Sequence, residues 1–281
     1  PSTVDFTPII RAVQASRPDI DLISLQRQNP NHGNLENPLR KLAAMRSPNV
    51  SLAVDLRDGL EATLKRNGDA QEKKFRHNQR KFDEIGGYRV IKASSPEEVD
   101  RLLDAFFKMK AARFAERGIS NVFAPLEVQT FFRRLYSSSL VYGDRPFEVK
   151  GIEINGELVA VHGMSINEHS VVCDFGGIVE MGANLSPGFF DYLCIEEACN
   201  AGKSLYDFSV GDEPYKRSWC DVETWQFDTL LPLTAKGRAA WAITTARGHA
   251  VRLIKSNAVL WSVLKQLRTK VAGTRSTPHD Q

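Results

Sequence analysis

Cysteine is scarce in this chain. Four of its 281 residues are cysteines, and they are Cys173, Cys194, Cys199 and Cys220. No two of them form a C-x-x-C pair, and no histidine lies near them in a metal-ligand pattern. The spacing therefore gives no sign of a zinc or redox-active site. We expect no metal cofactor, and we expect the four thiols to be reduced packing residues.

Long apolar runs are also lacking. A membrane-spanning helix needs about 20 consecutive apolar residues, and a secretory signal has its own apolar stretch. Neither occurs here, so we expect a cytoplasmic protein. The chain starts at Pro1 rather than at methionine, which leaves open that another segment precedes it.

Acidic residues are missing from the end of the chain. Between Asp228 and Asp280 there is none, whereas basic residues recur among apolar ones such as Trp241 and Leu253. We predict a tail of basic amphipathic helices over residues 236–281. Residues 236–270 are expected to contact an anionic membrane surface, where each basic residue contributes at most about 1 kcal/mol. That would place the protein peripherally at the inner membrane. Nucleic acid is the competing partner for a basic stripe, but no nucleic-acid motif accompanies it.

The order of the predicted elements indicates an α/β (α+β) fold with a mixed central sheet flanked by helices. For residues 85–235 the sequence pattern predicts the following order: a strand, two helices, three consecutive strands, a helix, a strand, a short helix and a final strand. Two signals are local. Ser95 followed by Pro96 and two glutamates is typical of a helix start. Asn155-Gly156 between two apolar runs predicts a hairpin. Residues 1–84 predict a short helix, two strands and a long charged helix.

Three motifs carry a resemblance to a known family. They are Ser186-Pro187-Gly188, Ile195-Glu196-Glu197-Ala198 and the run from Tyr206 through Gly211-Asp212-Glu213-Pro214-Tyr215-Lys216 to Trp219. With the element order, they resemble the CelD/BcsL-type acetyltransferases, bacterial members of the GNAT superfamily linked to cellulose and exopolysaccharide production. The resemblance implies a GNAT acyltransferase domain over residues 85–235. It also implies that residues 1–84 are an incomplete second GNAT-like unit with a basic linker helix.

A more distant resemblance bears on the donor. The element Tyr215-Lys216-Arg217-Ser218-Trp219 is similar to an aromatic-Lys-x-x-aromatic element of the Fem-type peptidyltransferases, which use aminoacyl-tRNA. Three functions stay open at this point. One is an acyl-CoA N- or O-acyltransferase, with acetyl-CoA as co-substrate, acting on a sugar or polysaccharide precursor in envelope or exopolysaccharide biosynthesis. The others are a Fem-like transferase and a degenerate GNAT module that acts as a binding subunit at a membrane complex.

The predicted donor site is the start of a helix at Pro187. Free N–H groups at a helix N-terminus suit the pyrophosphate of CoA, so Ser186, Pro187, Gly188 and Phe189 are the candidate residues. Family members usually have a Gln/Arg-x-x-Gly-x-Gly/Ala loop there, and this chain has Gly182-Ala183-Asn184-Leu185-Ser186-Pro187-Gly188 instead. The thioester oxygen is expected near Ile178 and Val179, at the end of the preceding strand.

Acyl transfer to an amine requires removal of a proton. Deprotonating a lysine-like amine costs about 4–5 kcal/mol at pH 7, and a placed base accelerates the step about 10²–10⁴-fold. The candidate bases are His162, Asp174, Asp207 and Asp212. A lone histidine in an apolar run, as His162 is, is more often a packing residue, and Asp212 could equally cap the helix that follows Gly211. Tyr215 is the candidate acid for the departing thiolate, and Lys216 is the candidate anchor or oxyanion-stabilising residue.

Overall fold

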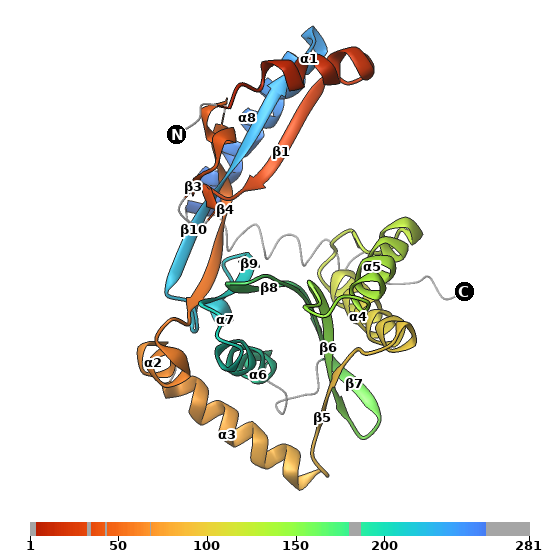
Figure 1. The fold of residues 1–281 in the computed structure, drawn as a ribbon, viewed down its shortest axis with the longest axis vertical. Helices are drawn as coiled ribbons and strands as arrows, with labels where there is room; N and C mark the ends of the chain where they lie inside the picture. The colour runs from red at the N-terminus through yellow and green to blue at the C-terminus, as the bar shows by residue number, and fades with distance from the viewer. Residues whose placement is uncertain (1–3, 33–34, 43, 68, 180–186, 257–281) are drawn as a thin grey trace, which may run out of the picture. The chain divides into compact units, whose positions relative to one another are not determined.

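The computed structural model describes residues 4–32, 35–42, 44–67, 69–179 and 187–256. These residues form two compact units (Figure 1). Residues 4–51 and 223–256 make the first, which we call the terminal unit. Residues 52–222 make the second, the central unit. Strand β4 (Ala44–Asp55) belongs to both, because the division falls between Ser51 and Leu52.

The terminal unit joins segments from both ends of the chain. Strand β1 (Leu22–Gln28) pairs antiparallel with β10 (Val222–Pro232), and β10 lies between β1 and β4. The Arg27 N–H donates to Asp228 Oδ1 over 2.8 Å. The remaining elements are α1 (Thr7–Ser16), β2 (Asn31–His32), β3 (Leu35–Glu36), the 3-10 helix η1 (Pro38–Lys41) and α8 (Ala235–Ser256). The second basic helix predicted for the tail lies outside the described residues.

The central unit is a mixed sheet with helices on both faces. From the end of β4 the strand order is β9 (Leu205–Val210), β8 (Ser170–Ile178), β7 (Glu157–Ile166), β6 (Phe147–Ile154) and β5 (Arg89–Lys92). Strands β5, β6, β7 and β8 pair antiparallel with one another in that order, and β8 pairs parallel with β9. The helices are α2 (Gly59–Asn67), α3 (Asp69–Glu84), α4 (Pro96–Glu116), α5 (Leu126–Ser139), α6 (Pro187–Asn200) and α7 (Pro214–Arg217).

Local sequence signals account for two of these elements. The Ser95 hydroxyl accepts the Glu98 N–H over 3.3 Å and caps α4, as helix N-termini require. Asn155 and Gly156 have φ angles of 50° and 83° and connect β6 to β7, the positive values that a two-residue hairpin turn needs. The predicted fold class, a mixed sheet flanked by helices, is confirmed.

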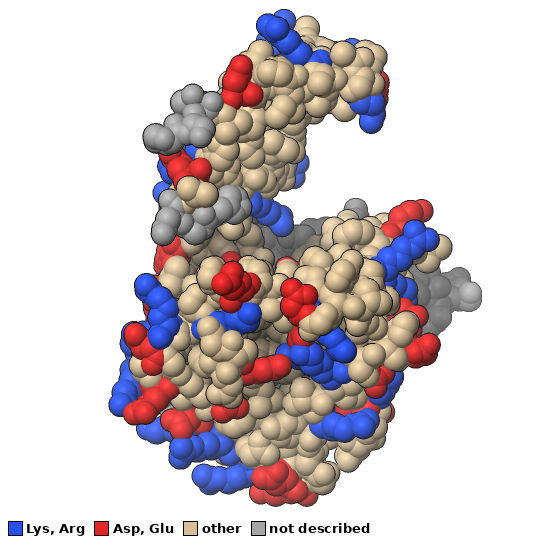
Figure 2. Space-filling view, viewed as in Figure 1, with Lys and Arg blue, Asp and Glu red and all other residues tan. Residues whose placement is uncertain are grey.

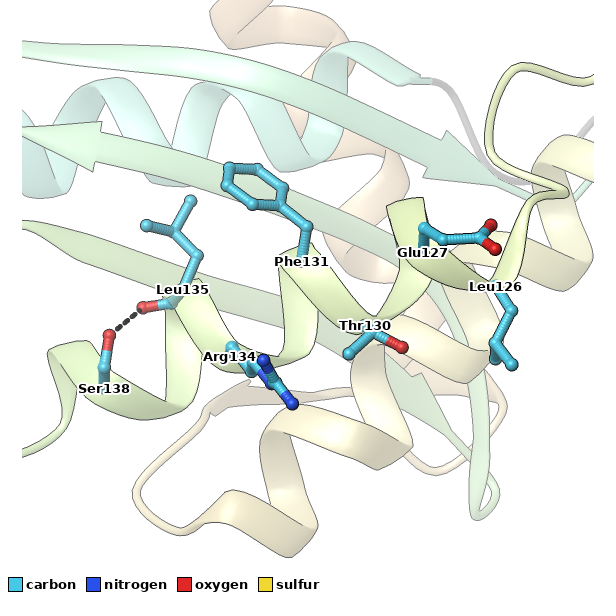
Figure 3. A pocket seen from close by; sticks show the side chains of 7 residues that line it. All are labelled: Leu126, Glu127, Thr130, Phe131, Arg134, Leu135 and Ser138. Carbon is cyan, nitrogen blue, oxygen red and sulfur yellow. Dashed lines mark hydrogen bonds between the residues drawn. The ribbon is translucent and has the colours of Figure 1, made fainter.

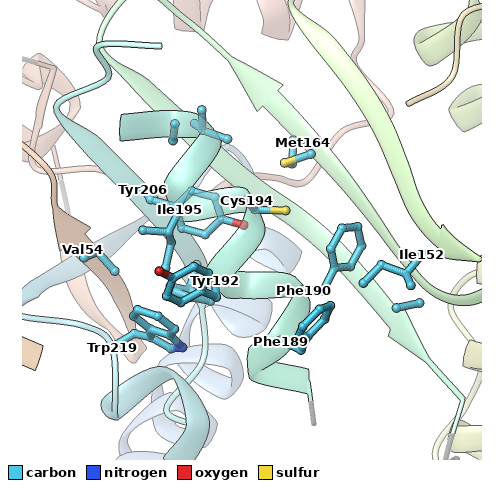
Figure 4. Packing of buried hydrophobic residues seen from close by; sticks show 14 of the residues in the cluster. Val54, Ile152, Met164, Phe189, Phe190, Tyr192, Cys194, Ile195, Tyr206 and Trp219 are labelled. Carbon is cyan, nitrogen blue, oxygen red and sulfur yellow. The ribbon is translucent and has the colours of Figure 1, made fainter. Parts of the chain in front are cut away.

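Two apolar cores hold the helices on the sheet. One lies on the α6 face, where Phe190 and Cys194 of α6 pack with Ile152, Met164 and Tyr206 of the strands (Figure 4). The other lies on the opposite face and is formed by α4, α5 and the strands facing them. Fully burying one large apolar side chain stabilises a fold by about 1.5–3 kcal/mol. The helices on both faces are therefore fixed firmly against the strands that carry the site described below.

The compact units divide the chain at positions other than the predicted boundaries after residues 84 and 235. Helix α3 packs within the central unit, where Phe75 stacks on Tyr192 with ring centroids 4.0 Å apart. Helix α8 belongs to the terminal unit and contacts β1. That residues 1–84 are the remnant of a second GNAT-like unit stays a prediction. None of the described helices is both long and apolar enough to cross a bilayer.

Candidate active site

Strands β8 and β9 are paired only where they begin. Their parallel register runs from Ser170 opposite Leu205 to Val172 opposite Asp207, while β8 continues to Ile178 and β9 to Val210. Ser209 has a left-handed φ of 62°, and its N–H donates to Asp207 Oδ1 over 2.7 Å. Backbone strain of this kind is concentrated at functional sites. The β8–β9 cavity, of about 340 Å³, lies along the diverging parts of the two strands.

The β8–β9 cavity brings together side chains from both faces of the sheet. It is lined by five of the predicted site residues, which are His162, Asp174, Ile178, Tyr215 and Lys216. It is also lined by residues that were not predicted as site residues, which are Lys110 and Arg113 of α4, Arg117 directly after α4, Asp191 of α6, Cys173 of β8 and Glu213. The separation of β8 from β9 is what lets α4 and α6 reach one space.

Lys216 and Tyr215 enter the cavity from the short helix α7. Lys216 is only 6% exposed, and its Nζ lies 3.2 Å from the Val210 carbonyl oxygen and 3.1 Å from Glu213 Oε2. Burial raises the pKa of Tyr215 above its ordinary value, and the nearby charges of Asp191 and Glu213 add to the rise. Tyr215 therefore keeps its proton at neutral pH and can donate a hydrogen bond.

His162 lies on β7 opposite Gly176. Its ring stacks on Phe190 with centroids 4.3 Å apart, and a Cβ on Gly176 would come within 2.9 Å of His162 Cδ2. Burial, followed by the charge of Lys110, lowers the pKa of His162 to about 3. The imidazole is thus neutral, with its Nε2 4.0 Å from Asp191 Oδ1.

Asp191 is the acid that the sequence reasoning missed. It is 3% exposed, and its Oδ2 has no hydrogen-bond partner among the described residues. Burial raises its pKa to about 7, although the charge of Lys216 acts in the opposite direction. An unpaired carboxylate in an apolar environment is costly. The signal was present in the sequence, because Asp191 interrupts the apolar run from Phe189 to Ile195.

Three cations at the C-terminal end of α4 face the same cavity, and the last of them, Arg117, is the C-cap residue of the helix. Lys110, Arg113 and Arg117 follow one another at spacings of three and four residues, which places them on one face of the helix. The Lys110 Nζ lies 5.6 Å from the centroid of the Phe106 ring. Burial, followed by the charge of Arg113, lowers the pKa of Lys110 to about 8.

The other predicted acids are placed differently. Asp174 is exposed and accepts a hydrogen bond of 2.5 Å from the Ser165 hydroxyl. Desolvation raises its pKa, while hydrogen bonds from Ser165 and Tyr136 act against the rise. Asp212 is outside the cavity lining and forms an ion pair of 2.5 Å with Arg217.

The predicted donor-binding residues do not lie together, and of the described ones only Ile178 lines the β8–β9 cavity. Pro187 and Gly188 begin α6, as expected, while Ser186 lies outside the described residues. Phe189 is 1% exposed and packs in the core, where its ring lies 4.8 Å from that of Phe75. The aromatic core rather than the cavity therefore accounts for Phe189. Val179 is exposed and does not line the β8–β9 cavity.

The register of β8 identifies the backbone donors that face the cavity. The Val179 N–H donates to the Val159 carbonyl over 2.8 Å, and Val161 is paired with Gly177 in the same register. Hydrogen-bonded and non-hydrogen-bonded pairs alternate along an antiparallel ladder. The N–H groups of Gly176 and Ile178 therefore point away from β7, toward the side on which β9 has separated.

Another hollow, of about 680 Å³, lies on α5 (Figure 3). Leu126 and Phe131 expose apolar side chains there, and the charged residues of its lining are Glu127 and Arg134. Its lining contains one cation and no buried acid, whereas the β8–β9 cavity combines a buried acid with several cations. On the face of the molecule shown in Figure 2, basic and acidic side chains are interspersed. Within the described ranges, no three His, Cys, Asp or Glu side chains are grouped so that they could hold a metal ion.

Comparisons with known proteins bear on this geometry. The model of the acetyltransferase (GNAT) domain family matches residues 69–217, which is more than half of the chain. Comparison with curated protein sequences gives no significant match.

Several solved structures share the fold. A conserved protein of unknown function from Bacteroides thetaiotaomicron is 10% identical with a TM-score of 0.52, over 81% of this chain and 76% of that one. The C-terminal domain of a putative lysylphosphatidylglycerol synthetase from Agrobacterium fabrum is 13% identical with a TM-score of 0.52, over 84% and 76%. FemX is 9% identical with a TM-score of 0.50, over 85% and 71%. At such identities the likeness shows the fold alone.

Proposed function

Because the chain belongs to the acetyltransferase (GNAT) domain family, we propose that it transfers an acyl group, acetyl in the first instance, from CoA to an acceptor amine or hydroxyl. The observation that carries the proposal is the β8–β9 cavity, in which a buried acid, a buried lysine and a protonated tyrosine meet. Acyl transfer needs a base, a donor to the departing sulfur and a group that stabilises the oxyanion.

The donor would lie along β8. Its acyl oxygen would accept from the N–H groups of Gly176 or Ile178, which the register of β8 turns toward the cavity. One preorganised donor of this kind contributes about 3–4 kcal/mol to transition-state stabilisation. The pyrophosphate would lie at the start of α6, near Pro187 and Gly188, where free N–H groups favour anions.

Asp191 is the proposed general base. The acceptor nitrogen or oxygen forms a bond to the acyl carbon, the carbon–sulfur bond breaks, and the acceptor proton moves to the Asp191 carboxylate. A pKa of about 7 suits this role at neutral pH. Tyr215 would donate a hydrogen bond to the departing thiolate, and Lys216 would stabilise negative charge beside it. His162, which is neutral and 4.0 Å from Asp191, would position the carboxylate.

For the acceptor we propose a sugar or polysaccharide precursor in envelope or exopolysaccharide biosynthesis. The resemblance of Ser186-Pro187-Gly188 and of the Tyr206–Trp219 run to the CelD/BcsL type supports this. The basic composition of residues 236–270 supports a position at an anionic membrane surface.

An aminoacyl-tRNA-dependent transfer is the second candidate. It is favoured by the shared fold with FemX and by the element Tyr215-Lys216-Arg217-Ser218-Trp219. In this element Trp219 is buried and Lys216 faces the cavity.

Calorimetric titration of the protein with CoA, acetyl-CoA and an aminoacyl-tRNA tests the donor. We expect CoA and acetyl-CoA to bind, and the Lys216→Met variant to retain binding while losing turnover. Tight binding of the aminoacyl-tRNA with no response to millimolar CoA would replace the first candidate by the second. CoA binding without acyl transfer to any amine or sugar acceptor would indicate a binding module.

A further inference from the structure

The α4 stripe, which we define as Lys110, Arg113 and Arg117, has no role in the acyl-transfer scheme above. All three residues line the β8–β9 cavity. With a rise of 1.5 Å per residue, the backbone positions of the stripe extend over about 10 Å of the helix. Three cations so close together repel one another, and like charges on one helix face are destabilising.

Among the described residues, other basic residues of α4 and of the neighbouring helix α5 form ion pairs, unlike those of the stripe. Arg101 of α4 forms an ion pair with Glu153. Arg133 of α5 pairs with Asp100 at 3.0 Å and also with Asp104. By contrast, the side chains of Arg113 and Arg117 form no ion pair or hydrogen bond within the part of the chain that the structure describes. Carboxylates thus form ion pairs with neighbouring arginines, whereas Asp191 and Glu213, which are described residues lining the same cavity as the stripe, form no ion pair with it; Glu213 is paired with Lys216 instead.

The helix dipole accounts for part of this arrangement. Cations are favoured at the last turn of a helix, and α4 ends at Glu116. This does not explain why the side chains face a cavity, nor why Lys110, nearly two turns before the end, is half-buried among aromatic rings. Lys110 is subject to the charges of Arg113 and Arg117 and to the opposing charge of Glu213, but Glu213 forms its ion pair with Lys216. A half-buried cation beside two further cations that have no ion pair of their own in the described ranges favours the binding of an anion.

The fold separates this anion site from the donor. Helix α6, whose N-terminus is proposed to hold the CoA pyrophosphate, packs on one face of the sheet, and α4 packs on the other. We propose that the acceptor carries a phosphate group and that Lys110, Arg113 and Arg117 bind it, so that the substrate is a phosphorylated sugar or a sugar diphosphate. This inference rests on the proposed function. A phosphate suits the stripe better than a carboxylate, because it carries more charge and offers three oxygens to arginine forks.

Calorimetry on the CoA-saturated protein tests the proposal, because CoA occupies the donor site. The probes are inorganic pyrophosphate, glucose 1-phosphate, glucuronate and glucose. We expect both phosphates to bind more tightly than glucuronate, and glucose to bind least. Arg113→Gln and Arg117→Gln should each weaken pyrophosphate binding about tenfold, as expected for loss of one charged hydrogen bond. Arg134→Gln on α5 removes the same charge outside the β8–β9 cavity and should change the affinity less than twofold.

The outcomes separate this proposal from the proposed function. Pyrophosphate affinity that is equal in wild type and in all three variants would overturn the phosphate site. So would weaker CoA binding in Arg113→Gln and Arg117→Gln, because the stripe would then serve the donor. If CoA fails to bind but pyrophosphate still depends on the stripe, the anion site stands and the acyltransferase function fails. Circular dichroism of each variant checks whether its fold is retained.

Discussion

Replacing Asp191 by asparagine should separate the stability of this protein from its activity. Asp191 is buried, and its pKa is raised from 3.8 to about 7, chiefly by burial. A carboxyl group with a raised pKa contributes stability that is fully present below its unfolded value and is lost as the pH rises through about 7. Each pKa unit corresponds to about 1.4 kcal/mol. Ionising Asp191 therefore lowers the free energy of unfolding by about 4 kcal/mol.

His162 acts in the opposite direction. Its pKa is lowered from 6.5 to about 3 by burial and by Lys110. The stability that it contributes is present above pH 6.5 and is lost as the pH falls through about 3. In the wild type the two contributions nearly cancel from about pH 4 to pH 6.5. In the Asp191→Asn variant only the pH-dependent contribution of His162 to stability remains. The variant's free energy of unfolding minus that of the wild type should rise by about 1.4 kcal/mol per pH unit up to pH 7.

Urea unfolding at half-unit pH steps measures this difference, and acetyl transfer measures activity. We expect turnover to fall about 10²–10⁴-fold in Asp191→Asn, even though the variant gains stability relative to wild type as the pH rises. Asp144→Asn, at an exposed position outside the β8–β9 cavity, is the control and should follow the wild type. If the difference in free energy of unfolding between Asp191→Asn and wild type does not change with pH, Asp191 does not have the raised pKa that its burial predicts. Unchanged turnover would remove it as the base.

Three further changes test the site. Gly176→Ala should lower the free energy of unfolding by about 1–3 kcal/mol, because the new Cβ would lie 2.9 Å from the His162 ring, which stacks on Phe190. Thermal unfolding measures this loss, and Gly143→Ala, where the new Cβ meets open space, is the control. Lys216→Met should lower kcat about 10²–10³-fold with little change in CoA affinity, and an equal loss of affinity would mean that Lys216 binds the donor instead. Tyr215→Phe should lower kcat about tenfold or more, and kinetics identical to wild type would exclude a contact with the departing sulfur.

The fold was predictable because its signals are local. The Ser95 cap, the Asn155-Gly156 turn and the apolar periods of the strands each depend on neighbouring residues. Four of the predicted site residues, His162, Asp174, Tyr215 and Lys216, do line one cavity, and that this cavity is the active site stays a proposal. That a different residue, Asp191, has its pKa raised to about 7 was not predictable, because desolvation depends on packing between distant segments.

Asp191 and the α4 stripe show where sequence reasoning ends. Asp191 interrupts an apolar helix, yet only the divergence of β8 from β9 turns that anomaly into a site. The stripe has the spacing of an ordinary solvated helix face, and the cavity in front of it is formed by strands about 60 residues further along. Phe189 shows the converse, because an aromatic ring at the start of α6 packs against α3 instead of facing a ligand.

The order of synthesis determines when β1 can pair with β10. Leu22 lies opposite Pro232, and the hydrogen bond from Arg27 to Asp228 spans 201 residues of sequence. During synthesis β1 leaves the ribosome long before its partner exists, whereas the segment from Leu52 to Val222 completes its own core first. Pairings of such long range form slowly, and an unpaired strand edge invites association with other chains. The edge of β1 is therefore exposed to association with other chains until β10, which follows the whole central unit in the sequence, has been made and pairs with it.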